Sequence, residues 1–132
     1  MRVGLVCMMA VALAAPAGAQ VPRVPVPMGA DETYGPCSTA YVYDLERPGE
    51  FLAVRSGPSV RYRELARLQN RQNVFACVRR GNWFGIVFDP IGRNDCGVLA
   101  PRQVNAAAYT GPCRSGWVYE RYLGGYADWI SP

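Results

Sequence analysis

Residues 52–68 read LAVRSGPSVRYRELARL, and this stretch decides the fold. In its first four residues, leucine and valine alternate with alanine and arginine, which is the two-residue period of a half-buried β-strand. The SGPS that follows ends the strand, because glycine tolerates positive φ and proline cannot donate a hydrogen bond to a ladder. The stretch therefore predicts a strand over residues 52–55 and a tight loop after it.

The second half of this stretch is ambiguous, because Leu65 and Leu68 have the spacing of one helical turn. The run is short, however, and it has no capping pattern that would start a helix. We therefore expect an irregular excursion over residues 59–68, in which Tyr62, Leu65 and Leu68 point inward.

Strands are also predicted on both sides of this stretch. Residues 41–43 are strand formers. The apolar runs 74–78 and 83–88 flank a tight turn at 79–82, which predicts a β-hairpin. Residues 117–123 are expected to form a last short strand or a single helical turn. The sequence therefore predicts an all-β fold.

The N-terminal residues have the pattern of an export signal. Arg2 precedes an uncharged apolar run over 3–15, and Ala-Gly-Ala at 17–19 offers an A-x-A cleavage site. The run is shorter than the ~20 residues that a bilayer span needs. We therefore expect a cleaved signal peptide over residues 1–19, no stable membrane span, and a periplasmic or secreted product. The proline-rich residues 20–36 are expected to form an extended linker, and residues 37–132 the domain.

Four cysteines remain after cleavage at that site. An even number in an exported chain favours two disulfides. A metal site is disfavoured, because the chain has no C-x-x-C pair and no histidine. The residues alone leave all three pairings open. A bridge between Cys96 and Cys113 would staple the long loop at 89–114, and Cys37 would then join Cys77.

The charged residues argue against several classes of function. The formal net charge is +4, every basic residue is an arginine, and the arginines are scattered, so we expect no nucleic-acid partner. Without histidine, Ser-His-Asp and Cys-His catalysis are excluded, and without lysine there is no phosphate-binding P-loop. The ten acidic residues are interpreted as solvated surface groups. We therefore expect a protein that is not an enzyme and needs no cofactor.

Three short motifs follow one another in a fixed order. The first is LAVRSGPS at 52–59 with Tyr62 after it, the second is GNW at 81–83, and the third is GWV at 116–118 followed by YL at 122–123. Together they resemble the bacterial SH3-like domain family. In that family asparagine is usual at the second position of the first motif, where this chain has alanine.

The resemblance covers about residues 40–123. It implies a small, half-open, SH3-like barrel of five to six strands with one long disulfide-stapled loop. It also implies a binding role without catalysis, with a peptide, a peptidoglycan fragment or an envelope protein as the partner.

Aromatic residues around these motifs are the candidates for a ligand-binding groove. Each tryptophan has two interpretations, because an indole ring fills a core as well as it stacks on a ligand. The candidate ligand-binding residues are Tyr62, Trp83, Trp117, Tyr119 and Tyr122.

Arg55 is expected to be structural. It lies on the strand face opposite the leucine and the valine, and we expect it to brace the turn at 56–57 through a carboxylate such as Asp44 or Glu64.

Two other hypotheses place the function elsewhere in the chain. In the first hypothesis, the protein acts as an envelope accessory or structural protein through the 97–112 loop, which holds Leu99, Val104 and Tyr109. Alternatively, the proline-rich segment 21–27 masks the groove, since SH3 domains bind polyproline helices.

Overall fold

The computed structural model describes residues 24–28, 35–99 and 108–128. These residues confirm the all-β class. The seven strands of the described part are β1 (Ser38–Val42), β2 (Leu52–Arg55), β3 (Glu64–Leu68), β4 (Asn73–Arg80), β5 (Trp83–Phe88), β6 (Arg114–Tyr119) and β7 (Leu123–Gly124). One short 3-10 helix, η1 (Glu120–Tyr122), joins β6 to β7.

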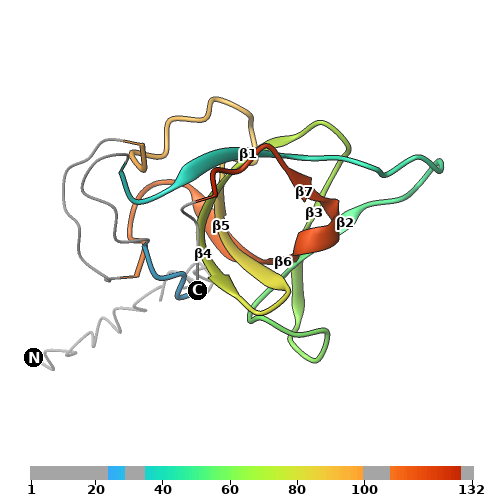
Figure 1. Ribbon diagram of the computed structural model, residues 1–132, viewed down its shortest axis with the longest axis horizontal. Coiled ribbons are helices and arrows are strands. Elements are labelled where there is room, and N and C mark those ends of the chain that lie inside the picture. The colour runs from blue at the N-terminus through green and yellow to red at the C-terminus, as the bar shows by residue number, and fades with distance from the viewer. Residues whose placement is uncertain (1–23, 29–34, 100–107, 129–132) are drawn as a thin grey trace, which may run out of the picture.

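All seven strands belong to one antiparallel sheet in the order β3-β2-β6-β5-β4-β1-β7. The sheet curls around its core, as Figure 1 shows, and β3 and β7 remain as its two edges. The result is the expected half-open barrel, with seven strands where five to six were predicted.

The predicted hairpin is confirmed. Strands β4 and β5 pair from Phe75↔Val87 to Arg80↔Trp83. The turn between them contains Gly81 at φ 56°, a left-handed conformation that glycine adopts at little cost.

The structure differs from the prediction over residues 59–68. Residues 64–68 form the regular strand β3, which pairs with β2 through Leu52↔Leu68 and Arg55↔Glu64. Of the three residues expected to point inward, Leu68 is buried, Leu65 is half-buried, and Tyr62 is 48% exposed in the loop before the strand. Backbone pairing with β2 therefore outweighs the weak helical spacing of the two leucines.

Two apolar cores lie on the two faces of the curled sheet. The inner core fills the barrel with side chains such as Val54, Phe84 and Val118. The outer core covers part of the opposite face of the sheet. Its buried members are Val24, Val26, Cys37, Phe75, Cys77, Val78, Val87, Cys96, Val98, Tyr109 and Trp117.

Residues 24–28 belong to the domain, although the sequence predicted a linker there. The side chain of Val26 is fully buried. Its carbonyl oxygen accepts a hydrogen bond from the Tyr109 N–H at 3.0 Å, and the Val24 carbonyl accepts one from the Ser115 hydroxyl at 2.8 Å. Alternating valines thus let a proline-rich segment pack as an extended strap over the outer core.

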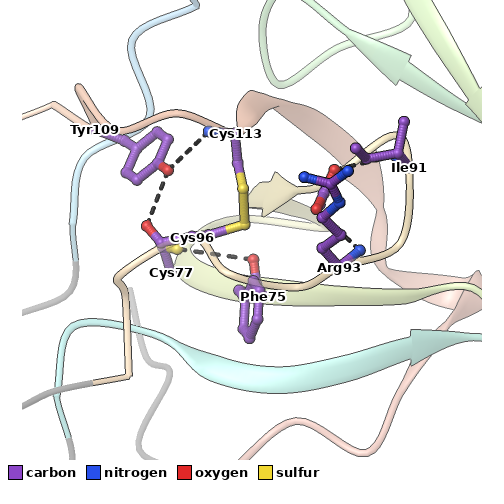
Figure 2. Close-up of a disulfide and its surroundings, with 8 residues drawn as sticks. Phe75, Cys77, Ile91, Arg93, Cys96, Tyr109 and Cys113 are labelled. Atoms are coloured by element: carbon purple, nitrogen blue, oxygen red, sulfur yellow. Dashed lines mark hydrogen bonds between the residues drawn. A yellow bond between two sulfur atoms is a disulfide. The ribbon is translucent and has the colours of Figure 1, made fainter.

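Two disulfides hold the fold together, and their pairing, which the sequence left open, is the one that staples the long loop. Cys37 joins Cys77, and Cys96 joins Cys113. Figure 2 shows the Tyr109 hydroxyl beside the second bridge, where it donates to the Cys96 carbonyl at 2.9 Å and accepts from the Cys113 N–H at 3.1 Å. Disulfides persist in oxidising compartments, so the chain belongs outside the cytoplasm.

A search of the described residues for a membrane-crossing helix finds no segment with the necessary length and apolar character.

The close crossing of β2 over β6 depends on a glycine, and this gives a first prediction. A Cβ atom on Gly116 would collide with the Val54 side chain and lie 3.0 Å from the Arg55 carbonyl oxygen. We expect Gly116→Ala to lower the free energy of unfolding by about 1–3 kcal/mol, as overpacking does. Urea unfolding measures this. The exposed Arg114→Ala on the same strand should stay within about 0.5 kcal/mol of the wild type, and an equal loss in both variants would contradict the argument.

Candidate functional site

A groove of about 540 Å³ opens on the surface beside β2, within the size range of small-ligand sites. We call it the aromatic groove. It is lined by Phe51, Leu52, Ala53, Arg55, Pro58, Ser59, Val60, Trp83, Tyr119 and Tyr122.

The groove exists because two neighbouring strands separate. Strand β2 pairs with β6 at a single position, Arg55↔Trp117. Strand β6 instead stays with β5 as far as Trp83↔Tyr119, and η1 then turns the chain. The opening is therefore bounded by β2 on one side and by the end of β6 and η1 on the other.

Three of the five predicted aromatic residues come together in this groove. Trp83 and Tyr119 face each other across the β5–β6 pair, with ring centroids 5.6 Å apart and an interplanar angle of 58°. Tyr119 is 39% exposed, and Trp83 is half-buried. Tyr122 reaches the same groove from η1. This arrangement offers ring faces and edges to a ligand while one side of each ring stays packed.

The other two predicted residues do not line the groove. Trp117 is 5% exposed and belongs to the outer core, where its ring packs over Gly85. Tyr62 packs its ring against Gly57 in the β2–β3 loop and is absent from the lining. Trp117 and Tyr119 are two residues apart on one strand and so share a face. The outer core covers that face at Trp117 and leaves it open at Tyr119.

Sequence reasoning missed the apolar part of the lining that comes from β2 and its loop. Phe51 precedes β2, and Pro58 and Val60 follow it. The one signal available in the sequence was an apolar residue, Val60, in a tight loop, and the structure shows that its side chain is exposed. Above Phe51, the Arg67 guanidinium carbon lies 3.8 Å from the ring centroid, which fixes the ring at the mouth of the groove.

Arg55 braces the loop as expected, but through a backbone group. Its Nη1 donates to the Tyr62 carbonyl oxygen at 3.0 Å. The two carboxylates proposed as its partners are engaged elsewhere. Glu64 accepts from Arg67 at 2.6 Å, and Asp44 accepts from Arg121 at 3.3 Å.

A second hollow of about 370 Å³ adjoins the aromatic groove and shares Tyr122 with it. We call it the polar pocket. Hydrogen bonding to Tyr122 and the electrostatic interaction with the same residue raise the pKa of Arg121, and the negative charge of Asp44 adds to them. The pocket is lined by Asp44, Glu46, Arg47, Glu50, Arg121 and Tyr122.

The two rival segments are only partly described. In the 97–112 loop, Tyr109 is held by its hydroxyl contacts, Leu99 is 47% exposed, and Val104 lies outside the described residues. In the segment 21–27, the described part from Val24 to Pro27 packs at the outer core and contributes nothing to the groove lining.

Across the part of the chain that the structure describes, no three cysteine, aspartate or glutamate side chains gather in a way that could hold a metal ion. No family model, no curated protein and no solved structure matches this chain.

Proposed function

We propose that this protein is an exported, non-catalytic, SH3-like binding module that holds a peptide, a peptidoglycan fragment or an envelope protein in the aromatic groove. One observation carries the proposal. The rings of Trp83, Tyr119 and Tyr122, from three different elements, converge on one open groove. The disulfides support residence in an oxidising compartment, and the expected signal peptide, which lies outside the described residues, agrees with the periplasm or secretion.

The lining of the groove favours binding over chemistry. Among the described residues that line it, there is no carboxylate, thiol or imidazole, and the ionisable side chains are one arginine and two tyrosines. The aliphatic hydroxyl of this lining, Ser59 Oγ, accepts a hydrogen bond from the Arg61 N–H at 3.2 Å, and no hydrogen bond joins it to a carboxylate in the described part of the chain. Nucleophilic catalysis by serine needs an adjacent general base.

The test of this function is a retention assay. The mature protein is incubated with purified peptidoglycan and, separately, with an immobilised envelope extract. We expect Tyr119→Ala to weaken retention by about tenfold, because an aromatic side chain at the centre of a site commonly contributes 1–2 kcal/mol or more. The matched control is Tyr41→Ala, which removes a 47% exposed tyrosine on β1 that lines neither hollow. Absence of wild-type retention on both materials would contradict the proposal, as would equal losses in the two variants.

A second function has one observation in its favour. Leu99 is a large apolar side chain that stays exposed within the stapled loop, which suits an envelope accessory protein that docks through residues 97–112. Leu99→Ser should then abolish retention, whereas Tyr119→Ala should not affect it. The opposite pattern supports the groove.

A further inference from the structure

Opposite charges flank the two ends of β2 where it lines the groove. Glu50 lies just before the strand and lines the polar pocket, whereas Arg55 is the last residue of the strand and lines the groove itself. At ~3.3 Å per residue, the five steps from Glu50 to Arg55 cover about 16 Å. The polar pocket therefore places negative charge at one end of β2, and the groove places a positive side chain at the other.

The polar pocket has more acid than base. Its two arginines are paired, Arg47 with Glu50 at 3.9 Å and Arg121 with Asp44 at 3.3 Å. Glu46 makes no ion pair with any described residue. The negative charge of Glu46 is therefore available to pair with a cationic group of a ligand.

Arg55 is the basic counterpart of Glu46, at the other end of β2. It forms no ion pair with any carboxylate in the described part of the chain, and a single Nη1 contact to the Tyr62 carbonyl holds it in place. The side chain is half-buried among apolar neighbours. A guanidinium has five N–H donors, so Arg55 can accept a carboxylate from a ligand without losing its contact to the loop.

The backbone of β2 is also open on the groove side. The strand pairs along its length with β3, from Leu52↔Leu68 to Arg55↔Glu64, but with β6 only at Arg55. The Leu52–Ala53 part of that edge has no strand partner among the described residues, and both residues line the groove. An unpaired strand edge is a template for an extended chain.

We propose that the aromatic groove binds an extended peptide of about six residues as an added strand beside β2, with a carboxylate on Arg55 and a cationic group in the polar pocket. This inference rests on the proposed function and names its ligand class. Antiparallel addition, the more stable arrangement, places the carboxylate toward the N-terminal end of the peptide. Between the charged ends, an apolar or aromatic side chain packs on Trp83 and Tyr119.

Charge order is tested first, by NMR titration of the isotope-labelled mature protein. The probe is Glu-Val-Tyr-Val-Thr-Lys with both termini blocked, and the matched probe has glutamine at both ends. We expect the charged peptide to bind at least tenfold more tightly. Arg55→Gln should remove the advantage of the glutamate, and Glu46→Gln that of the lysine. Arg61→Gln, a control in the exposed loop outside the lining, should remove neither.

Strand addition is tested with the same peptide after N-methylation of alternate amides. The N–H groups of successive residues in a strand point to opposite edges, so only one of the two alternating sets of N–H groups can donate to β2. We expect one methylated set to abolish binding and the other to retain it. Equal tolerance of both sets would overturn strand addition and favour a ligand held by its side chains alone.

The outcomes separate this inference from the function on which it rests. If the charged and neutral peptides bind equally, or if peptidoglycan is retained through Tyr119 while no peptide binds, the inference is overturned and the binding function stands. If neither the wall material, nor the envelope extract, nor the peptides bind, both are overturned.

Discussion

Replacing Cys37 and Cys77 with alanine is expected to lower the free energy of unfolding by about 4 kcal/mol. The bridge joins residues 40 apart in sequence and ties the start of β1 to the middle of β4. Without it, the unfolded chain regains the entropy that a closed ring of this length forbids. Domains of this size have only about 5–15 kcal/mol of stability, so the loss removes a large part of the total.

The measurement is thermal unfolding followed by circular dichroism. A loss of about 4 kcal/mol corresponds to a fall in Tm of about 15–30 °C for a domain of this size. The comparison is the double alanine variant of Cys96 and Cys113, which are 17 apart in sequence and for which we expect about 3 kcal/mol. An unchanged Tm in the Cys37–Cys77 variant would show that packing at the outer core holds β1 and β4 together without the bridge.

The second large effect is expected at Trp117. Its ring is 5% exposed and packs over Gly85 in the outer core. We expect Trp117→Ala to lower the free energy of unfolding by about 3–5 kcal/mol, because it leaves a cavity that the strap and the sheet cannot fill. Trp83→Ala should cost less stability, because Trp83 is half-buried at the edge of the groove.

Urea unfolding and the retention assay together separate the two tryptophans. Trp117→Phe keeps an aromatic ring in the core, so it should remain folded and bind its ligand with unchanged affinity. Trp83→Ala should remain folded and lose binding by about tenfold, the loss typical of an aromatic anchor. A folded Trp117→Phe variant with tenfold weaker binding would contradict the placement of Trp117 in the core.

Both predictions concern the outer core, against which Trp83 packs at the edge of the groove. Trp117 lies at the one position where β6 still pairs with β2, and the groove begins where that pairing ends. The outer core and the two disulfides within it therefore restrain the ring of Trp83. Such preorganisation reduces the entropy lost on binding.

Features that depend only on residues adjacent in the sequence could be predicted from the sequence. The alternation in LAVR, the break at SGPS and the turn before Trp83 each follow from the conformational preferences of a few adjacent residues. They sufficed for an all-β fold and for the hairpin, whereas the three aromatic residues of the groove were candidates because they lie around the motifs of the resemblance. The even number of cysteines likewise indicated two bridges in an exported chain.

A local sequence pattern does not show which side chains will be covered by distant segments of the chain. Trp117 and Tyr119 share a strand face, yet one is buried and the other open, because the strap at 24–28 and the disulfide-bonded loop pack over only one of them. Likewise, Arg55 donates a hydrogen bond to a backbone carbonyl and not to the expected carboxylate, because both candidate acids pair with other arginines. Burial and pairing between distant segments are settled by competition among all the contacts of the folded chain, so only the tertiary structure decides them.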